Sequence, residues 1–149
     1  MIQKGVFNML KKIPQSLSPD LVKVLMEMGH GDEIVIGDGN FPGASHTDKL
    51  IRCDGFMIPN LLQSILELFP LDTYTESPVV LMEVVKGDSY NPQIWDVYKR
   101  ILEDSEERNT NIEYLERFAF YEKSKSAYAI VTTSEKSLYA NIILKKGVI

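Results

Sequence analysis

The sequence predicts a single α/β domain of three layers, in which a mixed, mostly parallel sheet lies between two layers of helices. Segments with apolar residues at helical spacing alternate along the chain with short apolar, β-branched runs, a pattern typical of a sheet covered on both faces. The chain has 149 residues, of which 44% are hydrophobic, enough for one sizeable core. We therefore predict one domain over residues 9–149, preceded by an extension over residues 1–8.

The first predicted helix begins at Pro19. Ser18 before it can cap the free amides, and proline is tolerated at the first helical position because its missing N–H has no partner there. One face carries the apolar residues Leu21, Val24, Leu25 and Met28. Gly29 is expected to end the helix in a left-handed cap, which places His30 just beyond it.

A buried strand is predicted over residues 33–37, because three consecutive β-branched residues suit a strand covered on both faces. Asp38 then lies at its carboxyl end. A short strand is predicted over residues 49–53. A second helix begins at Pro59 and is stopped by Pro70, and a polar turn follows it.

The second half of the chain continues the alternation. The clearest strand prediction covers residues 79–85, and a helix with a charged, solvated tail is predicted over residues 92–106. A further strand is predicted over residues 112–115. The aromatic-rich segment 117–123 fits a short helix or a strand equally well.

The last two predicted strands cover residues 128–133 and 139–144. The polar turn 134–137 joins them, as in a hairpin. This short connection favours an antiparallel pair, and it is the reason for predicting a mixed sheet rather than a purely parallel one.

Composition and charge exclude several classes of function. The net charge is −5, the pI is about 5.1, and no Lys/Arg run is longer than two, which disfavours nucleic-acid and anionic-membrane partners. The single cysteine, Cys53, allows no intrachain disulfide and indicates a reducing compartment such as the cytosol. No apolar run approaches the roughly 20 residues that span a bilayer, and no signal-peptide pattern is present.

Candidate chemical groups flank the strand predicted over residues 33–37. His30, between two glycines, is either a loop histidine without a role or a general acid/base, since a free imidazole titrates at about 6.5. Asp38, also between two glycines, is either a turn residue or a ligand contact, because ligands of open α/β sheets bind outside the carboxyl ends of strands. His46 lacks a comparable setting and is predicted to lie at the surface.

Several kinds of site are not supported by the sequence. Residues 37–39 do not form a dinucleotide loop, because Pro42 interrupts any following helix and Asp38 would repel a phosphate. His30 and Asp32 do not extend into a metal-ligand set, and no nucleophile elbow is present, so we predict neither a metal nor a cofactor. Tyr121, Tyr139 and Asn141 can hydrogen-bond a polyol, although they also fit ordinary sheet or surface positions.

Seven short blocks between residues 9 and 148 carry a resemblance to a known family. They are LSPDL at 17–21, MGHGDEI at 28–34, NFP at 40–42, IRCDG at 51–55, LDTY at 71–74, RFAFYE at 117–122 and YANIILKKGV at 139–148. In this order they resemble the ribose pyranase and L-fucose mutarotase (RbsD/FucU) family, and its L-fucose mutarotase branch in particular. Cys53 and Ala140 stand where alanine and glycine are usual, and residues 1–8 have no counterpart.

The resemblance implies a cofactor-independent isomerase that interconverts sugar anomers, by acid/base opening and closure of the ring, and assembles as a ring-shaped homo-oligomer, commonly a decamer. It implies that His30 is the proton donor and that Tyr121 is a second catalytic residue. The positions implied to contact the sugar are Asp38, Asp72, Arg117, Tyr139 and Asn141. The implied sugar is L-fucose. D-ribose pyranase activity and a non-catalytic sugar-binding subunit remain as alternatives, the second disfavoured by the presence of His30.

The length of the predicted strand limits how these residues combine. A strand rises about 3.3 Å per residue, so an extended path from His30 to Asp38 separates their backbones by roughly 26 Å. One sugar cannot touch both. Unless the glycine-flanked loop folds back sharply, we therefore predict that the His30 and Asp38 around one sugar come from neighbouring subunits.

Overall fold

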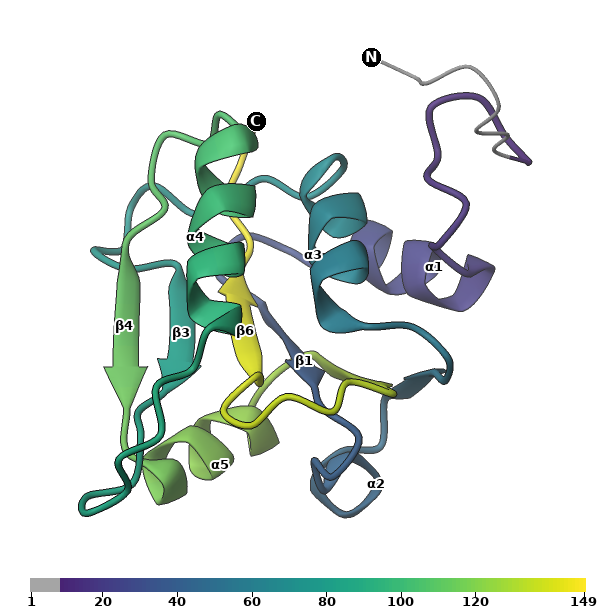
Figure 1. Cartoon of the computed structure of the whole chain (residues 1–149). Helices are drawn as coiled ribbons and strands as arrows, with labels where there is room; N and C mark the ends of the chain where they lie inside the picture. Colours follow the sequence, from purple (N-terminus) through teal and green to yellow (C-terminus); the bar gives the residue numbers. More distant parts are fainter. Residues whose placement is uncertain (1–8) are drawn as a thin grey trace.

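A six-stranded sheet in the order β2-β5-β1-β6-β3-β4 lies at the centre of the computed structural model, which describes residues 9–149 (Figure 1). The strands are β1 (Glu33–Gly37), β2 (Leu50–Cys53), β3 (Val79–Met82), β4 (Ile112–Leu115), β5 (Ala129–Thr133) and β6 (Ile142–Lys145). β6 runs antiparallel to its neighbours β1 and β3, and the other pairs are parallel. The predicted mixed, mostly parallel sheet is confirmed. The extension predicted over residues 1–8 lies outside the described residues.

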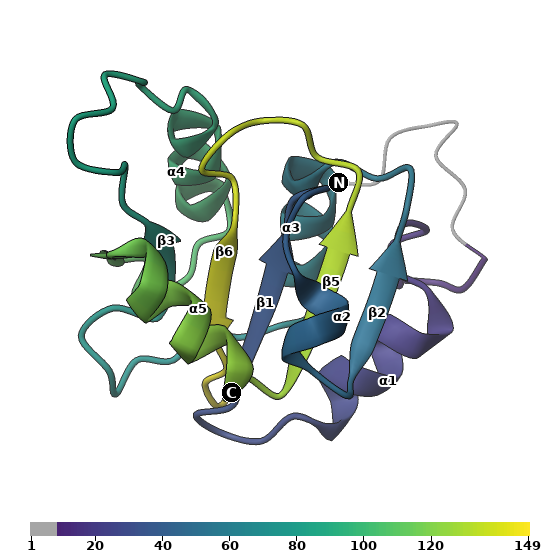
Figure 2. The ribbon, with the colours of Figure 1, turned by 90° about the horizontal axis from the view of Figure 1, so that it is seen from below.

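Helices cover both faces of the sheet. They are α1 (Pro19–Glu27), α2 (Gly43–His46), α3 (Ile58–Leu66), α4 (Ile94–Asp104) and α5 (Arg117–Lys125). Figure 2 shows α2 and α5 on one face, with α1, α3 and α4 behind the sheet. None of the helices in the described range is long and apolar enough to cross a membrane.

The apolar residues of β1 show how the sequence creates a core on each face. Side chains alternate between the two faces of a strand. Ile34 and Ile36 pack in the larger cluster, which includes α1, α3 and α4, whereas Val35 packs in a smaller cluster with Phe41 and Phe120. All three of these β1 side chains are fully buried. The predicted burial of this strand on both faces is therefore correct.

The end of α1 differs from the prediction. The Ser18 hydroxyl caps the start as expected, accepting from the Leu21 amide at 3.2 Å. At the other end Met28 is already extended, so Gly29 does not form a left-handed cap. The Gly29 amide instead donates to the Asp32 carboxylate at 2.8 Å, and Gly31 is the residue with a positive φ, 86°. This loop, rather than a helix cap, sets the position of His30.

The ambiguous segment 117–123 is helical. The Glu116 carboxylate accepts hydrogen bonds from the amides of Phe118 at 2.9 Å and Ala119 at 3.1 Å, which caps the first turn of α5. A carboxylate at this position also interacts favourably with the helix dipole. Phe120 anchors the helix in the smaller core cluster.

The last two strands do not form the predicted hairpin. β1 lies between β5 and β6, and the segment 134–141 passes the carboxyl end of β1 before β6 begins at Ile142. Buried Glu135 holds this segment, because its carboxylate accepts from the amides of Ile58, Lys136 and Ser137. Tyr139 and Asn141 therefore lie in a loop rather than in a strand.

Two other predicted boundaries change. β3 ends at Met82 instead of Val85. The Glu83 amide still donates to the Leu115 carbonyl of β4 at 2.8 Å, but the Val85 amide donates to the Tyr139 hydroxyl at 3.3 Å. Residues 43–46, predicted as loop, form the short helix α2. The strand predicted over residues 112–115 is present with the same bounds as β4. The helices predicted from Pro59 and over residues 92–106 are present as α3 and α4, with ends shifted by a few residues.

Candidate functional site

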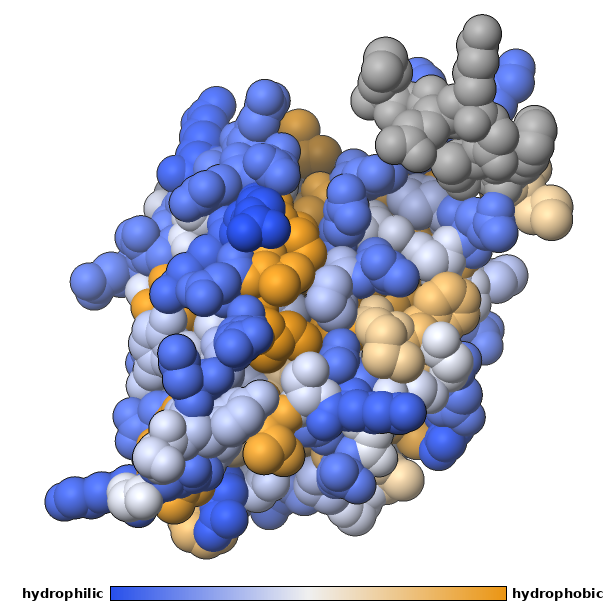
Figure 3. Space-filling model, viewed as in Figure 1, coloured by the Kyte–Doolittle hydropathy of each residue, from blue (hydrophilic) through white to orange (hydrophobic). Residues whose placement is uncertain are grey.

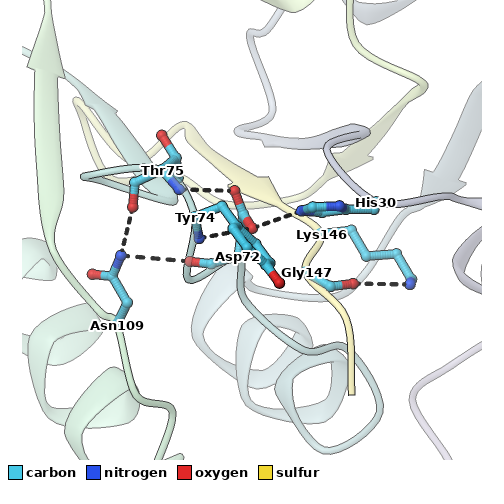
Figure 4. A network of polar contacts seen from close by, with 7 residues as sticks. All are labelled: His30, Asp72, Tyr74, Thr75, Asn109, Lys146 and Gly147. Carbon is cyan, nitrogen blue, oxygen red and sulfur yellow. Dashed lines mark hydrogen bonds and ion pairs between the residues drawn. The ribbon is translucent and has the colours of Figure 1, made fainter.

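His30 and Asp72 meet at the edge of the sheet where β1 begins. The His30 Nε2 atom lies 3.0 Å from the Asp72 Oδ1 atom (Figure 4). The Asp72 side chain is 5% exposed and the His30 side chain 43% exposed. Backbone contacts to the end of β6 bring the two together, since the Gly31 amide donates to the Lys146 carbonyl and the Asp72 amide to the Lys145 carbonyl. The pair thus joins a buried acid to an imidazole open to solvent.

Hydrogen bonds keep Asp72 ionised despite its burial. Burial acts to raise the pKa of Asp72, but the amides of Tyr74 and Thr75, each 3.1 Å from a carboxylate oxygen, and the His30 imidazole outweigh it and hold this pKa below its usual value. A carboxylate only accepts hydrogen bonds, so the bonded Nε2 of His30 carries the proton. In neutral His30 the other nitrogen, Nδ1, is then free to accept a proton.

Two residues that the sequence did not single out complete this edge. The Tyr74 ring lies 5.1 Å from the His30 ring, between centroids, and Tyr74 is 77% exposed. The Asn109 side-chain amide donates to the carbonyls of Thr75 at 2.9 Å and Asp72 at 3.5 Å, and so fixes the turn that carries Tyr74 (Figure 4). The LDTY block placed Tyr74 beside Asp72, but nothing in the sequence connected Asn109 to this turn.

Gly147 allows the chain after β6 to pass close to Asp72. A Cβ atom on Gly147 would lie 2.5 Å from the Leu71 carbonyl oxygen and 2.8 Å from the Asp72 Cα atom. Both are backbone atoms, which cannot give way as a flexible side chain can. A hydrogen bond from the Gly147 amide to the Pro70 carbonyl, at 2.8 Å, holds the two segments together.

Asp38 and Asn141 meet at the opposite edge, where β1 ends. The Asp38 amide donates to Asn141 Oδ1 at 2.7 Å, and the Asp38 carboxylate accepts from the Asn40 amide at 2.9 Å. Asn141 is buried and Asp38 half-buried. Burial raises the pKa of Asp38, an effect that the Asn40 and Phe41 amides offset only in part.

Tyr139, at the same edge, is held on several sides. Its hydroxyl donates to Asp88 Oδ2 at 2.6 Å, which raises the pKa of Tyr139 and lowers that of Asp88. The Trp95 indole donates to the Tyr139 carbonyl at 2.8 Å, and the Tyr90 ring stacks on the Tyr139 ring with centroids 6.0 Å apart. No sequence motif pointed to Asp88, Tyr90 or Trp95.

Tyr121 and Arg117 project from α5. The half-buried Tyr121 ring packs against Phe41, 5.8 Å away, and His46, 5.7 Å away, between centroids. His46 is half-buried, and it lies at the surface with its ring packed against Phe41 and Tyr121. Arg117 is exposed, lies over the Phe118 ring and is near enough to Tyr139 for its charge to lower the pKa of that residue. Both side chains belong to the Asp38 half of the molecule.

The seven predicted site residues thus form two separate groups in one chain. The first group, His30 with Asp72, lies at the start of β1. The second group lies around the end of β1 and consists of Asp38, Arg117, Tyr121, Tyr139 and Asn141. Within residues 9–149 no three His, Cys, Asp or Glu side chains are grouped as metal ligands.

Two surface hollows lie apart from these groups. One, of about 520 Å³, is lined by residues 44–49 with Lys125, Ala127 and Tyr128. Another, of about 300 Å³, lies between α3 and α4 and includes Leu66 and Ile101, where Figure 3 shows apolar surface along the seam between the two helices. Neither hollow contains any of the seven predicted site residues.

Comparison with known proteins gives consistent matches over nearly the whole chain. Residues 11–149 match the model of the "RbsD / FucU transport protein family". The L-fucose mutarotase of Histophilus somni (strain 2336) is 46% identical over 140 residues, which are 94% of this chain and 97% of that protein.

Solved structures show the same fold. The fucose mutarotase in complex with L-fucose from Streptococcus pneumoniae superposes with a TM-score of 0.90 at 59% identity, covering 94% of this chain and 99% of that one. The RbsD of Bacillus subtilis complexed with D-ribose superposes with a TM-score of 0.71 at 26% identity, covering 89% and 95%. The likeness is thus greater to the fucose-bound protein than to the ribose-bound one.

Proposed function

Because the chain belongs to the RbsD / FucU transport protein family, we propose that it is an isomerase that interconverts the α and β anomers of L-fucose without a cofactor. The ionised, buried Asp72 bonded to the exposed His30 carries this proposal, since it is a proton-transfer pair open to a ligand. L-fucose is favoured over D-ribose because the protein solved with L-fucose is 59% identical and the one solved with D-ribose 26% identical.

Anomer exchange requires only proton transfers and rotation about one bond. A proton goes to the ring oxygen and another leaves the anomeric hydroxyl, so the ring C–O bond breaks and an open-chain aldehyde forms. After rotation the same steps run in reverse and close the ring on the other face. No electrons are gained or lost. A positioned acid/base group contributes about 10²- to 10⁴-fold to such a reaction.

His30 is suited to this exchange because Asp72 fixes one of its nitrogens. With the Nε2 proton held by the Asp72 carboxylate, Nδ1 is the atom that gives a proton to the sugar or takes one from it. The anionic carboxylate also stabilises the imidazolium that forms when Nδ1 is protonated. We assign Tyr121 the second proton-transfer role, at the other side of the sugar.

The second group, around the end of β1, supplies the contacts that hold the sugar in our proposal. The Asp38 carboxylate accepts hydrogen bonds from hydroxyl groups, and Asn141, whose oxygen is engaged by the Asp38 amide, offers its amide N–H groups. The Arg117 guanidinium is a further donor. Tyr139 adds aromatic surface suited to the C–H faces and methyl group of a 6-deoxy sugar.

We infer that the complete site combines His30 and Asp72 of one subunit with the second group of a neighbour, in a ring-shaped homo-oligomer that is a decamer. Support comes from the positions of His30 before β1 and Asp38 after it, since the five residues of this strand alone span about 13 Å at roughly 3.3 Å per residue. Each half also exposes a large apolar side chain beside its site residues, Tyr74 at 77% and Phe118 at 62%. A neighbouring subunit would bury these side chains.

We also place the protein in the cytosol, with a monosaccharide as its partner. Cys53 is a free, buried thiol, as expected in a reducing compartment. The net charge of −5 disfavours nucleic-acid and anionic-membrane partners.

The activity is tested by NMR exchange spectroscopy on anomeric mixtures of L-fucose and D-ribose. We expect the wild-type protein to accelerate exchange of L-fucose well above the buffer rate and that of D-ribose less. Acceleration of D-ribose alone would move the assignment to a pyranase. Sugar binding without faster exchange would identify a non-catalytic sugar-binding subunit, and no effect on either sugar contradicts the proposal.

The shared site is tested by mixing two variants that each lack a proposed proton-transfer group, His30→Ala and Tyr121→Phe, through co-expression. If a site draws on two subunits, it is active only when both of the halves that form it are unmutated. With random mixing each half is unmutated in about half of the cases, so about one quarter of the sites should recover activity. A site built within one chain gives no recovery. Light scattering on the same samples measures the number of subunits.

A further inference from the structure

The loop between β3 and α4 reaches across the sheet edge to Tyr139. Asp88 in this loop accepts a hydrogen bond from the Tyr139 hydroxyl at 2.6 Å, and the Val85 amide donates to the same hydroxyl at 3.3 Å. A phenol has a single proton to donate. In Tyr139 that proton is committed to a carboxylate, the stronger class of acceptor.

Asp88 also holds a second ring beside Tyr139. Its other carboxylate oxygen, Oδ1, accepts from the Tyr90 amide at 2.9 Å, and the Tyr90 ring stacks on Tyr139 with an interplanar angle of 26°. The Tyr139 backbone has a φ of 57°, uncommon for a residue with a side chain, and the Trp95 indole bonds its carbonyl. One carboxylate thus ties a stacked aromatic pair to the loop of residues 83–93.

We propose that Asp88 is a positioning residue that fixes Tyr139 so that the sugar meets the ring of Tyr139 rather than its hydroxyl. The inference rests on the proposed function, in which Tyr139 contacts the sugar. A ring held in this way recognises apolar C–H groups, and the methyl group of a 6-deoxy sugar is one of them. In this proposal Asp88 acts through Tyr139 and Tyr90, each of which donates to one of its two carboxylate oxygens.

The first test compares Asp88→Ala, Asp88→Asn and Tyr139→Phe in the anomer-exchange assay with L-fucose. We expect Asp88→Ala and Tyr139→Phe each to raise KM by about 10-fold with little change in kcat, since each removes one charge-assisted hydrogen bond that orients the ring. Asp88→Asn keeps an acceptor and retains most of the affinity. Glu83→Ala, an exposed acid in the same loop, is the matched control.

The double variant Asp88→Ala/Tyr139→Phe distinguishes positioning from direct contact. If Asp88 acts through the Tyr139 hydroxyl, the double variant has the KM of either single variant, because both mutations break the same bond. Effects on KM that multiply would show that Asp88 touches the sugar, which overturns the proposal. A lower melting temperature with unchanged KM would show a merely structural role and also overturns it.

NMR titration of the Tyr139 phenol gives a readout that needs no activity. The bond to Asp88 raises the pKa of Tyr139, so Asp88→Ala lowers that pKa, whereas Glu83→Ala leaves it unchanged. An unchanged pKa in Asp88→Ala contradicts the positioning contact. A wild-type protein that accelerates no anomer exchange would contradict the proposed function, while a lowered Tyr139 pKa in Asp88→Ala would still support positioning by Asp88.

Discussion

The two ends of β1 are built in different ways. At the start, backbone amides and one imidazole converge on the buried Asp72, and the result is a single reactive group, His30. At the end, polar and aromatic side chains from several elements surround Asp38 and share hydrogen bonds among themselves. The first arrangement suits proton transfer, and the second suits holding several hydroxyl groups. Changes at the first end should therefore affect kcat, and changes at the second end, apart from those at Tyr121, should affect KM.

The largest effect is expected at the start of β1. His30→Ala removes the proposed acid/base group and should lower kcat by about 10²- to 10⁴-fold. Stability should change little, because Asp72 keeps its bonds to the Tyr74 and Thr75 amides. NMR exchange measures kcat and urea unfolding measures stability. Lys99→Ala, at an exposed position of α4, is the control. An exchange rate close to that of the wild type would remove His30 from the mechanism.

Asp72→Asn should have the next largest effect. The variant keeps the size of the side chain but loses the charge that orients the imidazole, a hydrogen bond worth about 1.5–3 kcal/mol, so kcat should fall by about 10- to 100-fold. Asp54→Asn, in an exposed ion pair with Arg52, is the matched control. A rise in KM alone would place Asp72 with the sugar-holding residues and contradict the proposed difference between the two ends of β1.

The same variant makes a prediction about stability and pH. The folded pKa of Asp72 lies below its ordinary value of 3.8, so its ionisation stabilises the fold above that value and this stability is lost as the pH falls through the folded pKa. The wild type should therefore lose stability in acid more steeply than Asp72→Asn. Urea unfolding between about pH 6 and pH 3 measures the difference. Parallel curves would show that Asp72 titrates alike in the folded and unfolded chain.

Gly147→Ala should destabilise the start of β1 through backbone contact alone. The added Cβ would lie 2.5 Å from the Leu71 carbonyl oxygen, and overpacking of this kind costs about 1–3 kcal/mol. The free energy of unfolding should fall by that amount, and kcat should fall as Asp72 moves. Gly29→Ala is the control for unfolding, because its Cβ would meet only the Asp32 carboxylate at 3.6 Å. Equal stability of the two variants would contradict the close approach.

The smallest effect is expected at the end of β1. Burial raises the pKa of Asp38, so this carboxyl is protonated, and loses acceptor capacity, at a higher pH than an ordinary aspartate. The KM for L-fucose should therefore begin to rise, on acidification, at a pH above that expected from the ordinary value of 3.8. Asp38→Asn should raise KM at neutral pH and remove this pH dependence. A pH effect confined to kcat would assign Asp38 to proton transfer.

Local sequence signals predicted most of the helices and strands, but few of the contacts between residues far apart in the chain. The cap at Ser18 and the β-branched run of β1 depend on neighbouring residues, and the structure confirms both. The Glu116 cap of α5 also depends on neighbouring residues, but the sequence left segment 117–123 open between a helix and a strand. In contrast, the Asp38–Asn141 and His30–Asp72 contacts join residues 103 and 42 positions apart. They depend on the position of β6 in the sheet, which the polar turn 134–137 wrongly suggested would be beside β5.

The residues around Tyr139 illustrate the same limit. Family resemblance pointed to Tyr139 and Asn141, but no motif connected them with Asp88 or Trp95, which lie in a loop and a helix far along the chain. The prediction that the Tyr139 hydroxyl is available to a sugar followed from residue type alone. Its actual partner depends on where β3 ends, and β3 ends earlier than its apolar run indicated.

The position of β6 also governs how the chain comes together during synthesis. β6 pairs with both β1 and β3, so it joins the β2-β5-β1 part of the sheet to the β3-β4 part. It is the last of these strands to leave the ribosome. Until then the hydrogen-bonding edges of β1 and β3 lack their partner, and unpaired edges promote aggregation. Premature termination before residue 142 should therefore yield an aggregation-prone product, in which β1 and β3 each expose an unpaired edge.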